Sequence, residues 1–371
     1  MRQTDKEEGE RLQQNVSPSH RRIVSPSEID WSKVRRVLVV RLRSIGDTVL
    51  ATPSLIALRR FLPEAQIDVL LEDWVAPVLE GFDAVDNVLT VSRKDKKSRI
   101  KTAWQIRQSR YDVAVNLHGG TTATFFVRAS GAKYRVGFAE YQYNFLYTHL
   151  APSSLNFWAT DHIHSAEQQL ALLGLVGVPV EDKPKSRLAV TDSAHNSIEK
   201  KLSSFILHPS SFALLHPAAA FETKQWATES FARVAEFLSA KNLQIIAVTA
   251  KKERGVLEKL KQIAQVPIYI FDELTLPEIT ALASKAKIFV GNDSGIAHIA
   301  AAINTPSVIV FGPSNPNHWR PWTDAPNEII LSETTCDHQL DKIRKGSENP
   351  KCIRCITVEA VSEAIERILP K

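Results

Sequence analysis

The chain has 371 residues, 44% of them hydrophobic and 23% charged, which is the balance of a soluble protein with enough length for two ordinary domains. The formal net charge of +5 is weak and scattered, so it does not indicate a nucleic-acid-binding protein, although it suits phosphate-bearing ligands or an anionic membrane face. Only three cysteines occur, at Cys336, Cys352 and Cys355, which excludes a fold held together by a disulfide framework.

Residues 1–30 are polar and aperiodic, and they predict a disordered tail that lacks the apolar core of a signal peptide. Arg21 and Arg22 leave membrane contact open as an alternative to a fully solvated tail. No uncharged apolar run approaches the ~18 residues of a membrane span. We therefore expect a cytoplasmic protein, with peripheral contact at the inner face of the cell membrane as an open alternative.

From residue 34 onward, short β-branched runs alternate with helical patterns, which predicts a parallel sheet with helices on both faces. The expected strands are residues 37–42, 67–71, 88–91, 112–117 and 134–138, and the expected helices are residues 47–61, 99–108 and 122–130. The alternation stops at residues 141–160, which are aromatic and irregular, and a helix is expected over residues 163–176.

Residues 180–211 are rich in Pro, Lys and Ser and predict the boundary between two lobes, after which a second alternating series begins. Its expected strands are residues 213–216, 244–249, 268–271, 287–290 and 307–311, and its expected helices are residues 230–240, 252–264, 277–285, 296–303 and 358–369. For the last helix, a return onto the first lobe is one option. We predict an α/β protein of two doubly wound, Rossmann-like domains, residues 31–195 and 196–371, that face a central cleft.

The first candidate site is the turn after the strand at residues 37–42, where Gly46 permits a tight turn and Asp47 stands at a helix start. Ligands of open parallel sheets bind beyond the carboxyl ends of the strands. Asp47 has two interpretations: it caps the helix, or it accepts a proton from an attacking hydroxyl as a general base. The turn lacks the glycine pattern of a dinucleotide site.

The second candidate site, residues 291–298, runs from a strand into a helix and contains Asp293, Ser294, Gly295 and His298. A helix N-terminus presents free N–H groups and a partial positive charge, which suits a diphosphate. The alternative is a capped helix with a buried histidine.

The third candidate site follows the first strand of the second lobe and contains His216 and Lys224, close to Trp226. Lys224 can neutralise a phosphate as a point charge, or it is a surface lysine beside a packing tryptophan. Glu253, after the next strand, can bind ribose hydroxyls or is an exposed residue of a first helical turn.

Two weaker patterns concern metals. Asp161, His162 and His164 give no complete ligand set, so a structural or acceptor-side use is favoured. The three cysteines with His338 would make a zinc site, but a single C-x-x-C is a weak signal.

Together, four stretches resemble the lipopolysaccharide heptosyltransferases of glycosyltransferase family 9, over nearly all of residues 34–369. The stretches are Gly46-Asp47 with Thr52-Pro53, residues 112–120 with 135–138, His216-Pro217 with Lys224 and Trp226, and Asp293-Ser294-Gly295 with His298 and residues 311–313. Their order and spacing are specific, whereas each stretch alone is a weak signal.

The resemblance implies an inverting, metal-independent glycosyltransferase of the GT-B fold that needs no cofactor. It implies transfer of a heptose, or a related sugar, from an ADP-linked donor to a lipid-linked core oligosaccharide, with Asp47 as the base. The implied donor-binding residues are Lys224, Glu253, Asp293, Ser294, Gly295, His298 and His216, and the implied acceptor-binding residues are Arg41, Arg43, Gly46 and His118.

The chain also departs from the family pattern. Thr249-Ala250 stand where the family usually has glycines, and Ala218 and Ala219 stand where it often has glycine or small hydroxyl residues. These departures leave the donor sugar open. Two alternative functions also stay open, a sugar-nucleotide epimerase, which shares this architecture, and a glycan-binding protein that has lost turnover.

Overall fold

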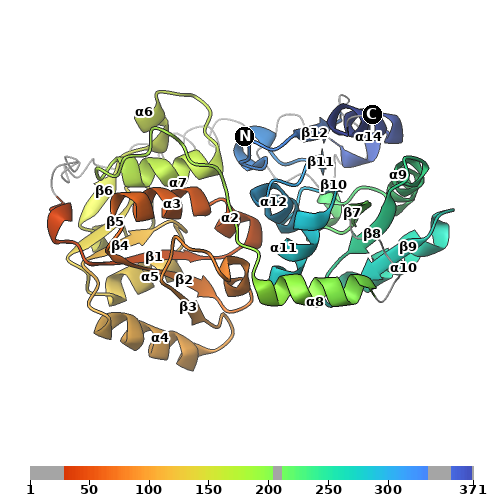
Figure 1. Ribbon diagram of the computed structural model, residues 1–371. Helices are drawn as coiled ribbons and strands as arrows, with labels where there is room; N and C mark the ends of the chain where they lie inside the picture. The colour runs from red at the N-terminus through yellow and green to blue at the C-terminus, as the bar shows by residue number, and fades with distance from the viewer. Residues whose placement is uncertain (1–28, 204–210, 333–351, 370–371) are drawn as a thin grey trace, which may run out of the picture.

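The computed structural model describes residues 29–203, 211–332 and 352–369, and these form two halves, each built on a six-stranded parallel sheet (Figure 1). The strands of the first sheet are β1 (Arg36–Leu42), β2 (Gln66–Glu72), β3 (Asn87–Val91), β4 (Val113–Asn116), β5 (Tyr134–Phe138) and β6 (His149–Ala151). The strands of the second sheet are β7 (Phe212–His216), β8 (Gln244–Val248), β9 (Ile268–Phe271), β10 (Ile288–Asn292), β11 (Ser307–Phe311) and β12 (Asn327–Leu331).

The two sheets share one topology. The strand order is β3-β2-β1-β4-β5-β6 in the first sheet and β12-β11-β10-β7-β8-β9 in the second, so each sheet winds outward in both directions from a central pair. In such sheets the crevice where the winding direction reverses is the usual ligand site. It lies beyond β1 and β4 in the first half and beyond β7 and β10 in the second.

Helices cover both faces of each sheet. Those of the first half are α2 (Ile45–Val49), α3 (Thr52–Phe61), α4 (Lys96–Gln108), α5 (Thr121–Ala129), α6 (Ser154–Trp158) and α7 (Ser165–Gly174). Those that follow are α8 (Asp192–Ser203), α9 (Thr228–Ala240), α10 (Arg254–Ile263), α11 (Leu276–Lys285), α12 (Gly295–Ala302), α13 (Pro316–Trp319) and α14 (Val358–Ile368). Short 3₁₀ turns include η2 (Ala76–Leu79), η4 (Glu222–Lys224) and η5 (Lys251–Glu253).

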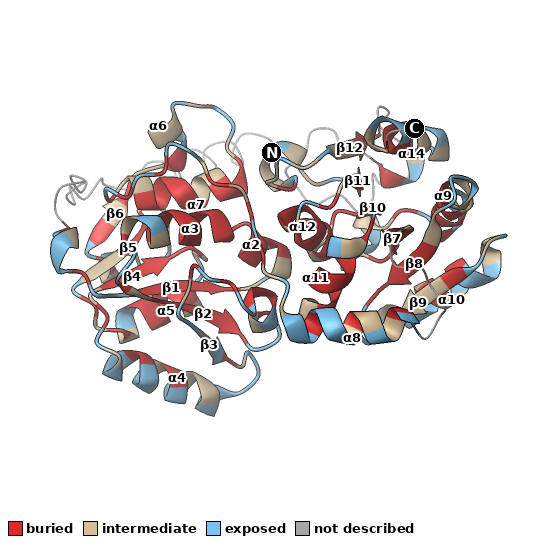
Figure 2. Cartoon of the chain, viewed as in Figure 1, coloured by how far each residue is buried: buried red, intermediate tan, exposed pale blue. Residues whose placement is uncertain are grey.

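Alternate residues of the buried strands enter different cores, because successive side chains of a strand point to opposite faces of the sheet. Val37 and Val39 of β1 pack with α3 and α7, whereas Leu38 and Val40 pack with α4 and α5. The first of these cores continues without a break into the second half, where it includes Leu214 of β7 and residues of α11 and α12. Figure 2 shows that the strands and many of the helices in both halves carry buried residues.

The first expected helix is two helices in the structure. Residues 47–61 were predicted as one, but α2 ends at Val49 and α3 begins at Thr52, with Pro53 in its first turn. Proline fits the first turn of a helix but disrupts the interior of one. The chain therefore starts a new helix just before Pro53 instead of continuing α2.

The structure differs from the sequence predictions at four further points. The irregular segment 141–160 contains the short elements β6 and α6, and the boundary segment 180–211 contains helix α8, which packs on α11. Strand β12 was not predicted. The last helix, α14, packs on α9, β11 and β12 of its own half, so the option of a return onto the first half was wrong.

The predicted tail lies outside the described residues except at its end, where Ile29 is buried. Within the ranges that the structure describes, no helix has both the length and the apolar character needed to span a bilayer.

Candidate functional site

Two cavities lie at the strand ends where the halves meet. The larger has a volume of about 670 Å³ and is lined mainly by the second half, at the ends of β7, β8 and β10. The smaller has a volume of about 240 Å³ and is lined mainly by the ends of β1, β4 and β5 and by α7. Asp47 and Trp319 line both cavities, so the two spaces share a wall.

The start of α12 forms one side of the large cavity. Ser294 is the N-cap, and its hydroxyl oxygen accepts a hydrogen bond from the backbone N–H of Ala297 at 3.4 Å. Gly295, the first helical residue, lies so close to the first half that a Cβ atom there would be 2.8 Å from Cβ of Ile45. The helix therefore presents its N-terminal N–H groups and their partial positive charge next to the first half.

Lys224 and Asp293 form an ion pair inside the large cavity, with 2.6 Å between Nζ and Oδ2. The Asp293 side chain is only 6% exposed, whereas that of Lys224 is 29% exposed. The ammonium group thus has one fixed partner and keeps donors for a ligand in the cavity.

Two histidines of this cavity are buried and neutral at neutral pH. Burial lowers the pKa of His298, although Asp293 and Asp47 act in the opposite direction, and its Nδ1 has no hydrogen-bond partner within the described part of the chain. Burial also lowers the pKa of His216, whose Nδ1–H donates to the carbonyl oxygen of Val248 at 2.8 Å. The bond to Val248 leaves Nε2 of His216 for another partner.

Glu253 lies at the far end of the large cavity, where η5 leads into α10. Its carboxylate accepts from the backbone N–H of Ala250 at 3.4 Å and lies 3.5 Å from the ammonium nitrogen of Lys252. The side chain is 22% exposed and lines the cavity.

Asp47 is held by three groups. It is the third residue of α2, and its Oδ2 accepts from the hydroxyl of Ser44 at 2.7 Å and from the backbone N–H of Ser44 at 3.2 Å. Its Oδ1 accepts from the guanidinium of Arg41 at 2.5 Å. Burial acts to raise the pKa of Asp47, but the positive charge of Arg41 and the bonds from Ser44 outweigh it and hold the pKa below the usual value. Asp47 therefore supports the helix start and is also ionised at the shared wall.

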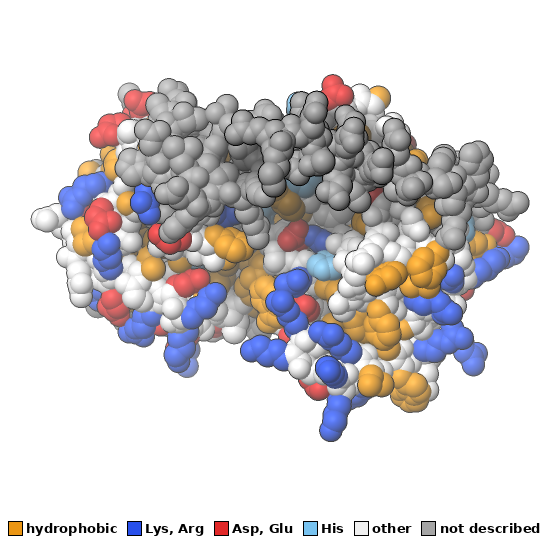
Figure 3. Space-filling view, turned by 180° about the vertical axis from the view of Figure 1, so that it is seen from behind, with side chains coloured by type: hydrophobic (Ala, Val, Ile, Leu, Met, Phe, Trp, Pro, Cys, Tyr) orange, Lys and Arg blue, Asp and Glu red, His pale blue; other side chains and the backbone are white. Residues whose placement is uncertain are grey.

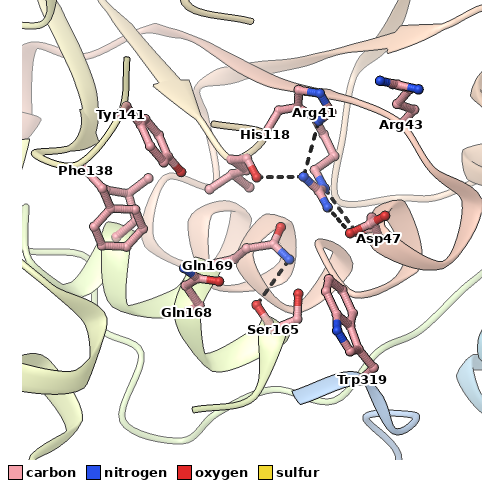
Figure 4. Close-up of a pocket in the computed structure, with 12 residues that line it drawn as sticks. Arg41, Arg43, Asp47, His118, Phe138, Tyr141, Ser165, Gln168, Gln169 and Trp319 are labelled. Atoms are coloured by element: carbon pink, nitrogen blue, oxygen red, sulfur yellow. Dashed lines mark hydrogen bonds and ion pairs between the residues drawn. The ribbon is translucent and has the colours of Figure 1, made fainter. Parts of the chain in front are cut away.

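Arg41 links Asp47 to the far side of the small cavity (Figure 4). The residue is 7% exposed, and its guanidinium also donates to the carbonyl oxygen of Leu117 at 2.8 Å. His118 lies 3.4 Å from the same guanidinium. Burial, together with the charges of Arg41 and Arg43, lowers the pKa of His118 to about 4, so this ring is neutral at neutral pH.

The structure brings most of the predicted residues together. All seven predicted donor-binding residues line the large cavity, and Arg41, Arg43 and His118 line the small one. Gly46, which was grouped with the acceptor side, lines the large cavity instead. Trp226 is a packing residue, since it is 1% exposed and its indole N–H donates to the carbonyl oxygen of Ile356.

Several cavity residues were not predicted. Trp319 of α13 comes from the second half and reaches the small cavity, where Tyr141, Gln168 and Gln169 also line the wall. No sequence pattern near Trp319 indicates this role, because the cavity lies against a segment far away in the chain. The adjacent Gln168-Gln169 on a helix was the one available signal.

The weaker metal candidates have other partners or lie outside the described residues. His164 accepts from the backbone N–H of Ala166, and its Nε2 donates to the carbonyl oxygen of Arg320 at 2.7 Å, so this histidine has structural partners on both ring nitrogens. Cys336 and His338 lie outside the described residues. Among the residues that are described, no group of three His, Cys, Asp or Glu side chains is placed to hold a metal ion.

Comparison with known proteins agrees with this arrangement. Relatives include lipopolysaccharide heptosyltransferase 3 of Escherichia coli, 25% identical over 89% of this chain and 98% of the relative. Another is lipooligosaccharide heptosyltransferase 2 of Haemophilus ducreyi, 25% identical over 84% of this chain and 92% of the relative.

Solved structures share the fold. A glycosyltransferase family 9 protein of Veillonella parvula superposes with a TM-score of 0.78 at 20% identity, covering 90% of this chain and 97% of that one. The E. coli ADP-heptose lps heptosyltransferase II superposes with a TM-score of 0.73 at 22% identity, covering 90% of this chain and 98% of that one. These neighbours have the GT-B architecture that the sequence predicted. The sequence profile of glycosyltransferase family 9 (heptosyltransferase) matches residues 99–348, so the chain belongs to this family of glycosyltransferases.

Proposed function

We propose that this enzyme transfers a heptose from ADP-heptose to a lipid-linked core oligosaccharide of the lipopolysaccharide type. The observation that carries the proposal is the shared position of Asp47, in the wall between a cavity suited to a nucleotide diphosphate and a basic cavity. The relatives named as lipopolysaccharide heptosyltransferases support the sugar and the acceptor class.

In this proposal residues 196–371 hold the donor. The diphosphate lies at the N-terminus of α12, near Ser294 and Gly295, with Lys224 as the cationic partner. Glu253 binds the ribose hydroxyls. A cation and a helix N-terminus stabilise the negative charge that develops on the departing diphosphate.

The transfer step uses Asp47 as the base. The acceptor hydroxyl attacks the anomeric carbon of the heptose, the bond from that carbon to the diphosphate oxygen breaks, and ADP leaves with the bonding electron pair. The hydroxyl proton passes to the carboxylate of Asp47, which is ionised because Arg41 and Ser44 lower its pKa. The attack comes from the face opposite to ADP, so the anomeric configuration inverts.

Residues 31–195 hold the acceptor. Arg41, Arg43 and His118 line the small cavity, where the two guanidinium groups suit the phosphate or carboxylate groups of a core oligosaccharide. A lipid-linked acceptor also implies contact with the inner face of a membrane.

The test is Asp47→Asn, which removes the basic oxygen and keeps the size of the side chain. We expect kcat for ADP release, measured on mixing ADP-heptose with a core acceptor, to fall about 10²- to 10⁴-fold. The affinity for ADP, measured by calorimetry, should change less than about threefold, because Asp47 does not hold the nucleotide. Asp182→Asn, at an exposed ion pair with Arg60, is the matched control.

Full activity of Asp47→Asn would contradict the assignment of Asp47 as the general base. Conversion of the nucleotide sugar in the absence of any acceptor would instead identify an epimerase. ADP-heptose binding without ADP release under any condition would identify a binding protein.

A further inference from the structure

The outer surface of helix α4 combines exposed apolar side chains with basic ones. Ile100 is 70% exposed and Trp104 is 63% exposed, and they stand one turn apart on the same side of the helix. Lys97 and Lys101 share that side, and all four residues are exposed. Phe125 of the adjoining helix α5 is 48% exposed. These five residues are called the α4 surface below.

The positive charge of the chain is concentrated around this helix. Residues 93–110 contain eight Lys and Arg and one acidic residue, a net charge of +7, whereas the whole chain carries only +5. The rest of the protein is therefore slightly acidic, and the expectation that the basic excess is scattered was wrong.

Within the described part of the chain, these eight basic side chains differ from most other charged groups in having no acidic partner. None of them forms an ion pair with a described residue, whereas in α10 Arg254 pairs with Glu258 and Lys259 pairs with Glu229. Exposed tryptophan and isoleucine side chains among unpaired cations form a surface suited to an anionic, partly apolar partner.

A third cavity connects the start of α4 with residues of the small cavity. Helix α4 packs on β3 and α5, on the face of the first sheet opposite α3 and α7. The third cavity, of about 310 Å³, is lined by Arg93 and Arg99 at the start of α4, and it shares Arg43 and His118 with the small cavity. Basic side chains thus form a series from the start of α4, through this third cavity, to the small cavity that is proposed to bind the acceptor. Figure 3 shows Lys and Arg side chains interspersed with hydrophobic ones over the lower part of this half.

We infer that the α4 surface docks the enzyme on an anionic phospholipid membrane. Trp104, Ile100 and Phe125 enter the boundary between head groups and acyl chains, and the lysines contact lipid phosphates. Tryptophan favours this boundary and long basic side chains reach to the head groups. The inference rests on the proposed function only for its purpose, which is to bring the small cavity to a lipid-linked acceptor.

The experiment is flotation of the full-length protein with vesicles, in the absence of nucleotide and sugar. Vesicles of phosphatidylethanolamine and phosphatidylglycerol at 3:1 are compared with vesicles of phosphatidylcholine. We expect binding to the anionic vesicles and at least tenfold weaker binding to the neutral ones. Binding should weaken as NaCl rises from 0.1 to 0.5 M, because salt screens the attraction of surface charges.

Substitutions on the α4 surface test whether it is the part of the protein that binds the vesicles. Lys97→Gln/Lys101→Gln should lower the partition coefficient by roughly 10- to 25-fold, since each basic residue near an anionic surface contributes about fivefold. Trp104→Ser should lower it on its own and leave the salt dependence in place. Lys200→Gln/Lys261→Gln, an equal change of charge at exposed positions of α8 and α10, should bind like the wild type.

Circular dichroism establishes that each variant is folded. Release of ADP with a lipid-free acceptor in solution should stay at the wild-type rate in the α4 variants. Absence of vesicle binding by the wild-type protein would overturn the inference, as would equal losses in the α4 variants and in the control. Because flotation needs no turnover, these outcomes are independent of whether the proposed transfer occurs.

Discussion

The imidazole of His298 lies against Gly46, so closely that a Cβ atom on Gly46 would stand 2.7 Å from Cδ2 of the ring. The two residues belong to different halves, and α2 and α12 meet through them and through Gly295 and Ile45. Glycine at these positions therefore sets how closely the proposed base and the proposed diphosphate site approach each other.

Gly46→Ala should force His298 or the whole of α2 to move. We expect kcat/KM to fall about 10- to 100-fold, because a displacement near 1 Å at reacting groups costs on the order of 100-fold. Gly255→Ala is the matched control, since Gly255 also lies in a helix but has no atom within 4 Å of an added Cβ. It should keep full activity and gain roughly 0.5–1 kcal/mol of stability. Equal activity of the two variants would show that the contact does not position the site.

Arg41 should determine the pH at which activity falls on the acidic side of the kcat/KM profile, because it controls the pKa of Asp47. Its charge is the largest influence that lowers the pKa of Asp47, and without it the effect of burial, which raises that pKa, is less opposed. Arg41→Gln should therefore move the acidic limb of the kcat/KM profile to higher pH. Arg43→Gln, which also lines the small cavity, should weaken acceptor binding and leave the limb in place. An unchanged limb in Arg41→Gln would mean that another group titrates there.

Lys224 should matter more for donor binding than Lys252, although both line the large cavity. Lys224→Met removes the cation and leaves the buried carboxylate of Asp293 facing the diphosphate, so the affinity for ADP should fall about 10- to 100-fold. Lys252→Met, at a side chain that is 76% exposed, should cost less than about threefold. Lys224→Met/Asp293→Asn should recover part of the loss, because the repulsive charge is gone. Calorimetric titration with ADP measures all three, and equal losses in the two single variants would argue against the assignment.

Glu278 should stabilise the attachment of α8 to α11. Burial acts to raise its pKa, but hydrogen bonds from Lys201 and Ser197 at 2.6 Å outweigh this and lower the pKa to about 2. A depressed carboxylate pKa adds stability above the unfolded-state pKa near 4.3, and that stability is lost as the pH falls toward the folded-state value. Glu278→Gln should lower the free energy of unfolding at pH 7 by roughly 2–3 kcal/mol.

Thermal unfolding measures this effect. The midpoint should fall by about 4–8 °C at pH 7, and the difference from the wild type should narrow below about pH 4.5. Glu366→Gln, at an ion pair whose carboxylate side chain is 57% exposed, is the control and should shift the midpoint little. A difference that does not change with pH would show that the ion pair is not its source.

The sequence predicts the sheets well because buried parallel strands are continuous β-branched runs. The strands at 134–138, 268–271 and 307–311 were predicted with the bounds that the structure has. The short elements β6 and α6 were missed because a few residues carry too little periodicity, and their burial depends on distant contacts. Helix α8 was missed because a Pro-, Lys- and Ser-rich composition outweighed the spacing of Ala194, Ile198 and Leu202, which are its buried residues.

The candidate site was predictable where it follows the strand ends directly, as Asp47, His216 and Asp293 do. Trp319 was not predictable, because it reaches the small cavity only through the packing of one half against the other. The two interpretations of Asp47 are compatible: it supports the start of α2 through Ser44, and it also lines both cavities.

The wall common to the two cavities has a consequence for inhibition. Because Asp47 and Trp319 border both spaces, a single compound with an ADP-like part in the large cavity and a sugar-acid part in the small one would cross this wall next to Asp47. Joining the two parts turns the second binding event into an intramolecular one, so such a compound should bind far more tightly than either fragment. Its linker should be short, since the same two side chains border both spaces.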